Sequence, residues 1–142
     1  PEATFTMAAR RFYTTRELRR EVMAAGLRIR WRGERLVLPG GSVWENGSMD
    51  EIGRQVDELH TINKPIASIC GATLLLARKG YLDSLKHTSN ASDYIRNFAV
   101  NYQGAGNYLN EHAVTDKNLI TANGIAPVEF ARENIQEHTI IR

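Results

Sequence analysis

The sequence predicts an α/β protein with three layers and a mostly parallel sheet. Two observations carry this prediction. Strand patterns and helix patterns alternate along the chain from residue 27 onward, and helices placed between strands are typical of parallel sheets. In addition, the segment Ile66–Ile69 has no polar face, as a strand buried in the middle of a parallel sheet requires.

Length and composition fit one globular domain, so we expect residues 1–142 to form a single domain. The chain has 142 residues, of which 42% are hydrophobic and 24% charged, and its formal net charge is +2. So small a charge gives no reason to expect binding to nucleic acid. The longest apolar stretch, over residues 72–77, is far shorter than the ~20 residues of a membrane span. The start of the chain lacks a signal-peptide pattern, so we expect a soluble, cytoplasmic protein without a membrane partner.

Residues 1–35 differ in composition from the rest of the chain. They contain nine arginines, no lysine and four glutamates, whereas residues 36–142 carry nine basic and twelve acidic residues. Thr14-Thr15-Arg16-Glu17 has the pattern of a helix-capping box, and Gly26 is suited to end the helix that follows. We favour a solvated helix over an RNA-binding arm, because the segment has few aromatic residues that could stack on bases.

The first strands are expected directly after this segment. Residues 27–32 alternate between apolar residues and arginines, which is typical of a half-exposed strand, and a turn is expected at residues 32–34. A second strand over residues 35–38 ends at Pro39-Gly40-Gly41, which predicts a tight loop. A helix that begins near Asp50 is expected next. Its buried stripe is expected to comprise Ile52, Val56, Leu59 and Ile62.

After the strand Ile66–Ile69 come Cys70 and a predicted helix over residues 71–79, which Gly80 is suited to end. The remaining chain predicts a strand at residues 87–89, a helix at residues 92–98, two strands around a turn within residues 113–122, and a final helix from Pro127. The buried residues of that last helix are expected to be Val128, Phe130, Ala131 and Ile135. Because the loops that follow parallel strands meet at one edge of the sheet, we expect Cys70, the Gly40-Gly41 loop and residues 123–126 to share a site.

Cys70 is the only cysteine of the chain and the candidate nucleophile. Ser68, Gly71 and Ala72 are small, as a sharp strand-to-helix turn around a nucleophile requires. The helix that follows would present its positive end to the sulfur and favour the thiolate. The backbone amides of Gly41 and Gly71 are expected to donate to an oxyanion formed on the substrate. The alternative is a buried structural cysteine.

His87 is the candidate proton carrier, because a thiol nucleophile needs a base or an ion-pair partner. The alternative is a partly buried strand histidine. The other three histidines (His60, His112 and His138) lack the spacing of metal ligands, so we expect neither a metal ion nor a cofactor. Trp44-Glu45 leaves two interpretations open: either it lines the site, or the tryptophan only packs in the core.

Four ordered motifs resemble the PfpI-type superfamily. They are Leu36-Val37-Leu38-Pro39-Gly40-Gly41, the stretch from Lys64 to Thr73, the stretch from Leu119 to Gly124, and Glu129-Phe130-Ala131. This group includes intracellular proteases, the Parkinsonism-associated deglycase and relatives of the class I glutamine amidotransferase domain. The resemblance covers residues 36–135 and implies a flavodoxin-like sandwich, a homodimer, and Cys70 as the nucleophile at a strand-to-helix elbow. It also implies a small electrophilic carbonyl compound or a peptide as the substrate.

The sequence departs from this family pattern in three respects. In the family, an N-terminal loop supplies a glutamate beside the cysteine, but residues 1–35 show no such segment, so we expect weak or absent activity. The glutamates available there fall on a predicted helix or turn: Glu17, Glu21 and Glu34. In relatives with a third active-site residue, the histidine aligns nearer Asn90 than His87. Residues 124–129 lack the histidine that a glutaminase needs, which disfavours that activity.

Two classes of function remain open. The first is a cysteine-dependent enzyme of the hydrolase, deglycase or glyoxalase type, in which Cys70 attacks a carbonyl group. The second is a noncatalytic or stress-responsive domain, in which Cys70 is reversibly oxidised to sulfenic acid. A third interpretation is a rearranged gene product that folds poorly, in view of its arginine-rich start.

Overall fold

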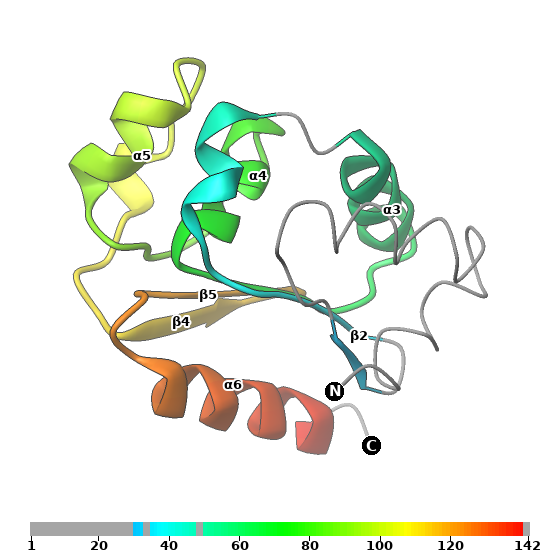
Figure 1. Ribbon diagram of the computed structural model, residues 1–142. Helices are drawn as coiled ribbons and strands as arrows, with labels where there is room; N and C mark the ends of the chain where they lie inside the picture. Colours follow the sequence, from blue (N-terminus) through cyan, green and yellow to red (C-terminus); the bar gives the residue numbers. More distant parts are fainter. Residues whose placement is uncertain (1–29, 33–34, 48–49, 141–142) are drawn as a thin grey trace.

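The computed structural model describes residues 30–32, 35–47 and 50–140 (Figure 1). The strands of this part are β1 (Arg30–Arg32), β2 (Arg35–Leu38), β3 (Ile66–Ile69), β4 (Ala113–Asp116) and β5 (Leu119–Ala122). The α-helices are α3 (Asp50–Thr61), α4 (Thr73–Arg78), α5 (Ser92–Phe98) and α6 (Pro127–Ile140). Short 3-10 helices are η1 (Ser42–Asn46), η2 (Cys70–Ala72) and η3 (Ala105–Asn107).

The five described strands form one sheet in the order β1-β2-β3-β5-β4. The inner strands β2, β3 and β5 pair in parallel, and the edge strands β1 and β4 pair antiparallel with their neighbours. This arrangement confirms the predicted α/β fold, with a parallel centre and two antiparallel edges. Because the three inner strands run in the same direction, the loops after Leu38, Ile69 and Ala122 all leave the same edge of the sheet.

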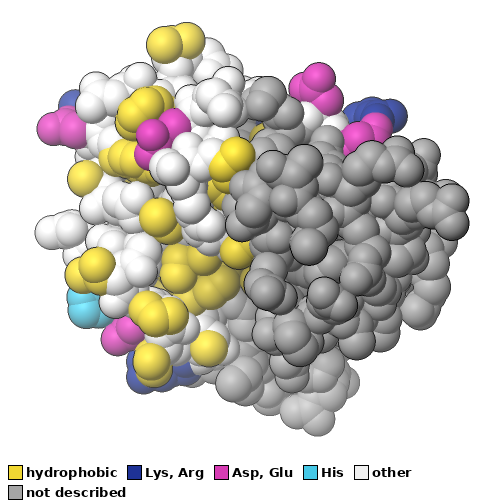
Figure 2. All heavy atoms as spheres, viewed as in Figure 1, with side chains coloured by type: hydrophobic (Ala, Val, Ile, Leu, Met, Phe, Trp, Pro, Cys, Tyr) yellow, Lys and Arg dark blue, Asp and Glu magenta, His cyan; other side chains and the backbone are white. Residues whose placement is uncertain are grey.

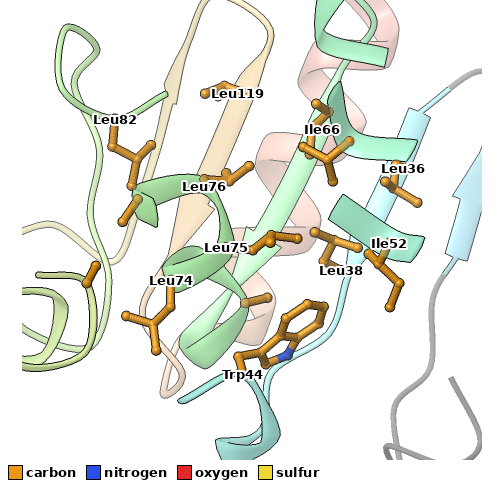
Figure 3. Packing of buried hydrophobic residues seen from close by; sticks show 14 of the residues in the cluster. Leu36, Leu38, Trp44, Ile52, Ile66, Leu74, Leu75, Leu76, Leu82 and Leu119 are labelled. Carbon is orange, nitrogen blue, oxygen red and sulfur yellow. The ribbon is translucent and has the colours of Figure 1, made fainter. Parts of the chain in front are cut away.

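Helices cover both faces of the sheet and complete a three-layer sandwich (Figure 1). Helices α3, α4 and α5 lie on one face, and α6 lies on the other. Apolar side chains buried between the sheet and the first group of helices form the larger core, whose labelled members in Figure 3 are Leu36, Leu38, Trp44, Ile52, Ile66, Leu74, Leu75, Leu76, Leu82 and Leu119. A smaller cluster under α6 contains Ala67, Ile120, Ala122 and Phe130. Removal of this apolar surface from water is the main force that holds the layers together.

Several predicted elements are confirmed with small shifts. The central strand has the predicted bounds, the helix over residues 92–98 is α5, and residues 113–122 form two antiparallel strands around a turn in which Lys117 has a φ of 54°. In α3, three of the four expected residues are buried: Ile52, Val56 and Leu59. The prediction for Ile62 is wrong, because α3 ends at Thr61 and the side chain of Ile62 is 49% exposed.

The strand expected at residues 87–89 is reduced to one parallel bridge between His87 and Tyr108. The N–H of His87 donates to the carbonyl oxygen of Asn107 at 3.2 Å, and the carbonyl oxygen of His87 accepts from the N–H of Leu109 at 2.8 Å. The N–H of Thr88, the next residue, donates to the side-chain oxygen of Thr121 at 2.9 Å. The helix expected at residues 71–79 also differs, since its first turn is the 3-10 helix η2.

The buried face of α6 differs from the prediction. Phe130 is buried and Asn134, one turn further along, is buried on the same face. Val128 is 66% exposed and Ala131 is exposed as well, so both lie away from the sheet. Within residues 127–134 the helix therefore packs through two positions four residues apart, and the expected stripe was wrong for Val128 and Ala131. The predicted burial of Ile135 falls outside the described side chains.

Some predictions fall outside the described residues. They include the capping-box helix after Thr14, the start of the first strand at residues 27–29, and the three N-terminal glutamates Glu17, Glu21 and Glu34. Among the described helices, none is long and apolar enough to cross a membrane.

Charged side chains of both signs and apolar side chains are interspersed on the described part of the face shown in Figure 2. Among the residues whose burial the structure describes, the large apolar side chains that are exposed are Ile62, Phe98, Val100, Leu109, Ile125 and Val128. Two of these, Ile125 and Val128, belong to the segment that follows β5, at the edge of the sheet where Cys70 lies.

Candidate active site

Cys70 occupies a sharp turn between the central strand and the helix that follows it. It comes directly after β3 and is the first residue of η2. Its φ is 60°, in the left-handed region that residues with a side chain rarely adopt. The hydroxyl of Thr73 donates to the carbonyl oxygen of Cys70 at 2.8 Å and thereby fixes the turn. Such strain persists only where the surrounding structure imposes it, and it is concentrated at functional sites.

Three loops pack closely around the Cys70 side chain, and each contributes a glycine. A Cβ atom on Gly40 would lie 2.7 Å from the Cβ of Cys70, and one on Gly124 would lie 3.0 Å from its sulfur. A Cβ atom on Gly71 would overlap the carbonyl oxygen of Gly41 and lie 3.2 Å from Cδ1 of Trp44. The loops after β2, β3 and β5 therefore converge on the thiol, as the sheet topology predicts.

Asn90 is the side chain that hydrogen-bonds to the thiol. Its Nδ2 atom donates to Cys70 Sγ at 3.3 Å, and its Oδ1 atom accepts the N–H of Gly124 at 2.9 Å. Because the N–H of Gly124 needs an acceptor, the amide group has only one orientation, with its NH2 group toward the sulfur. Asn123 Nδ2 donates to the backbone oxygen of Asn90 at 3.3 Å and ties the same two loops together again.

The two predicted oxyanion donors lie next to each other beside Cys70. Gly41 precedes η1, and Gly71 follows Cys70 within η2. The first N–H groups of a helix have no partner within that helix. Among the described backbone hydrogen bonds of loops and turns, none is donated by the amide of Gly41 or of Gly71. Within this set of bonds both N–H groups lack an acceptor, and their role as oxyanion donors stays a prediction.

His87 is fully buried, and its hydrogen-bond partners are not part of the group around Cys70. Its Nδ1 atom lies 2.7 Å from the carbonyl oxygen of Leu85, so this nitrogen carries the proton and donates. Its Nε2 atom then accepts from the hydroxyl of Tyr102 at 2.6 Å. Burial lowers the pKa of His87 and keeps the ring neutral. Both ring nitrogens are thus engaged, and neither bonds to Cys70. The side chain that touches the sulfur comes from Asn90, the position nearer to which the family resemblance aligns its histidine.

A polar pair that the sequence pattern does not reveal joins η1 and α5. The hydroxyl of Tyr94 donates to Oε2 of Glu45 at 2.9 Å. Trp44, the preceding residue, is buried and its indole N–H donates to Pro39 O at 2.9 Å, which settles its role as packing. The Trp44-Glu45 pair was noted in the sequence, but nothing there signalled its partner Tyr94, 49 positions away.

His60 and His112 make contacts with side chains other than Cys70. His60 stacks on Tyr81 with ring centroids 4.0 Å apart, and His112 lies 3.5 Å from Glu129. Within the described residues, no group of three or more His, Cys, Asp or Glu side chains is placed to hold a metal ion.

Comparison with known proteins identifies the family of this chain. The DJ-1/PfpI family matches residues 33–137, and the chain belongs to this family. The chain is 46% identical over 102 residues to YoaZ of Bacillus subtilis, which is described as an uncharacterized protease; the match covers 72% of this chain and 49% of YoaZ. The chain thus spans about half the length of this relative.

Solved structures of the same family have the same fold. A thiJ/pfpI family protein from Bacillus anthracis is 44% identical with a TM-score of 0.69, and the match covers 72% of this chain and 49% of that one. A DJ-1 superfamily protein from Agrobacterium tumefaciens is 34% identical with a TM-score of 0.67, with 74% and 56% covered. These relatives confirm the flavodoxin-like, glutamine amidotransferase-like sandwich implied by the four motifs.

Proposed function

We propose that this chain carries the nucleophile of a cysteine-dependent hydrolase or a related enzyme that attacks carbonyl groups. The observation that carries the proposal is the turn at Cys70, where a non-glycine residue with a φ of 60° presents a sulfur that accepts a hydrogen bond from Asn90. A strained turn of this kind exposes a nucleophile to substrate. The description of YoaZ as an uncharacterized protease supports a peptide as one candidate substrate.

The geometry suggests a division of roles in the attack. The thiolate sulfur of Cys70 adds to the carbonyl carbon, and the π electrons of the carbonyl move to its oxygen. The free amides of Gly41 and Gly71 then stabilise the oxyanion. With a peptide, collapse of this intermediate expels the amine, which takes a proton from solvent, and leaves a thioester on Cys70 that water then hydrolyses to a carboxylate and the free thiol. With an aldehyde, the oxygen takes up a proton and a hemithioacetal results.

Asn90 contributes a donor to this scheme and not a base. Its Nδ2–H group faces the sulfur, so it stabilises the thiolate but cannot take the proton of the thiol. His87 retains a place in the scheme only if it leaves its bonds to Leu85 and Tyr102, and we therefore propose Asn90 in its place as the side chain that acts on Cys70.

Substitution of Cys70 tests this proposal. We expect Cys70→Ser and Cys70→Ala to abolish hydrolysis of an unfolded protein substrate and turnover of dicarbonyl compounds, with little change in the melting temperature. The matched control is Ser84→Ala, at an exposed position outside the site. Full activity in both cysteine variants would contradict the assignment of Cys70 as nucleophile.

A second candidate function is reversible oxidation of Cys70. Two observations favour it: Cys70 is a partly exposed free thiol, and Asn90 and two unpaired amides surround it with donors that would bond to an oxygen on the sulfur. With hydrogen peroxide as the oxidant, the thiolate would attack one peroxide oxygen, release hydroxide and become sulfenic acid. We expect dimedone to label Cys70 after brief peroxide treatment, and an absence of label in the folded protein would exclude this function.

A further inference from the structure

The pair formed by Tyr94 and Glu45 plays no part in the scheme above. Tyr94 lies on α5 and Glu45 lies in η1, and the tyrosine hydroxyl donates its proton to the carboxylate at 2.9 Å. The ring of Tyr94 also packs against that of Phe98, with centroids 5.4 Å apart. A tyrosine has a single hydroxyl proton, so the remaining hydrogen-bonding capacity of this oxygen consists of lone pairs.

The two segments that carry the pair border the turn at Cys70. Asn90, which contacts the sulfur, comes two residues before α5, and Tyr94 lies in the first turn of that helix. Glu45 follows Trp44, whose ring borders Gly71. Burial raises the pKa of Tyr94, and the hydrogen bond to Glu45 and the negative charge of a Cys70 thiolate raise it further. The tyrosine therefore keeps its proton, and that proton remains on the bond to Glu45.

Arg78 holds the two halves of this group in place. Its guanidinium donates from Nη1 to Trp44 O, from Nη2 to Glu45 O at 2.9 Å, and from Nε to Phe98 O at 3.0 Å. One side chain thus links η1, which carries Glu45, to the end of α5, which carries Tyr94. The planar fork of arginine suits such a set of fixed acceptors, and it makes the pair part of a rigid frame.

We propose that Tyr94, fixed by Glu45, orients the substrate by accepting a hydrogen bond from a hydroxyl or N–H group adjacent to the carbonyl carbon that Cys70 attacks. The inference rests on the proposed function of Cys70 as nucleophile. It narrows the substrate class to carbonyl compounds that carry a donor at the neighbouring position, such as α-hydroxyaldehydes. A carbonyl compound without such a donor gains nothing from Tyr94.

Protection of Cys70 from alkylation tests this selectivity with two small probes. Glycolaldehyde has a hydroxyl beside its carbonyl, and acetaldehyde is the same aldehyde without it. Each adds reversibly to Cys70: the S–C bond forms, the C=O π bond breaks, and the thiol proton ends on the oxygen. The concentration of each aldehyde that halves the rate of iodoacetamide alkylation is measured on the folded protein, and the acetaldehyde value is divided by the glycolaldehyde value.

We expect this ratio to fall about 2- to 10-fold in Tyr94→Phe, the range that one hydrogen bond supplies. The matched control is Tyr81→Phe. It removes a hydroxyl that donates to Asp57, from a residue that follows the C-terminal end of α4, and this variant should keep the wild-type ratio. Glu45→Gln provides a second variant, because an amide no longer dictates where the tyrosine proton lies, and its ratio should also fall.

The outcomes separate the two proposals. If neither aldehyde protects folded Cys70 better than it protects the urea-unfolded chain, the nucleophile assignment fails. If both protect the folded protein but the ratio is the same in wild type, Tyr94→Phe and Glu45→Gln, Cys70 stands as nucleophile and the role of Tyr94 is wrong.

Discussion

The amide nitrogen of Asn90 lies 3.3 Å from the sulfur of Cys70 and donates a hydrogen bond to it. The other end of the same amide is held by the N–H of Gly124 at 2.9 Å, so the donor cannot turn away without breaking a second bond. A hydrogen bond to a charged acceptor is stronger than one to a neutral acceptor. Asn90 therefore holds a hydrogen-bond donor against the sulfur, and it links the loops after β3 and β5 into one site.

Replacing Asn90 by aspartate should slow the reaction of Cys70. Aspartate has the same shape and can still accept from Gly124, but it places an acceptor, and at neutral pH a negative charge, against the sulfur. We expect iodoacetamide alkylation at pH 7 to slow about tenfold or more, on the order of one charge-assisted hydrogen bond. The matched control is Asn107→Asp, whose amide donates to Asp83 O away from the site. Equal alkylation rates in wild type and Asn90→Asp would show that the bond has no effect on the thiol.

Replacing Gly71 by alanine should destabilise the fold. The added methyl group would overlap the carbonyl oxygen of Gly41, a backbone atom that cannot turn aside. We expect a loss of about 1–3 kcal/mol in the free energy of unfolding, as for other overpacked positions, and a larger loss for valine. The control is Gly106→Ala, since no atom lies within 4 Å of the position that its methyl group would occupy. Urea unfolding of both variants measures the difference. A free energy of unfolding that is the same in Gly71→Ala and in wild type would argue against the tight turn.

Stability should fall at acidic pH through His87. Burial lowers the pKa of this histidine below its ordinary value of 6.5, so between these values the unfolded chain binds a proton that the folded chain does not. The free energy of unfolding should therefore decrease as the pH falls below about 6.5. In His87→Gln, which is less stable overall, this part of the slope should vanish. Urea unfolding between pH 7.5 and pH 5.5 tests it, and identical slopes in the two proteins would contradict a neutral buried ring.

Arg78→Lys should loosen the frame around Tyr94 and Glu45. Lysine keeps the charge but cannot donate along the three directions that the guanidinium uses. We expect a loss of about 1–3 kcal/mol in the free energy of unfolding, because two partly buried carbonyl oxygens and one exposed carbonyl oxygen lose their donors. The comparison is Arg96→Lys, which alters an exposed pair with Asp93 and should change stability little. If both variants are equally stable, Arg78 does not clamp η1 to α5.

The sequence allowed the parts of the site that depend on neighbouring residues to be predicted. The strand, Cys70 and the helix are contiguous in the sequence, and small residues flank the turn. The local sequence pattern was therefore enough to predict the turn at Cys70. The positions of Gly41 and residues 123–126 followed from one further rule, that loops after parallel strands share an edge.

The contacts of individual side chains could not be predicted in the same way. His87 and Asn90 are three positions apart, and only the tertiary structure shows that the first bonds to Tyr102 and the second to Cys70. Tyr94 and Glu45 are 49 positions apart, and Arg78 bonds to both of their segments, which no local pattern encodes. The same holds for α6, where packing on the sheet selects Phe130 and Asn134, and leaves the more apolar Val128 exposed.

The most direct test of the account is the alkylation rate of Cys70 in the folded protein compared with the urea-unfolded protein at pH 7. The chain has one cysteine, so the rate of iodoacetamide incorporation reports on this residue alone. An activated thiolate at the turn should react faster in the folded protein than in the unfolded chain. A cysteine that reacts only after urea is added would contradict the central claim and identify Cys70 as a structural residue.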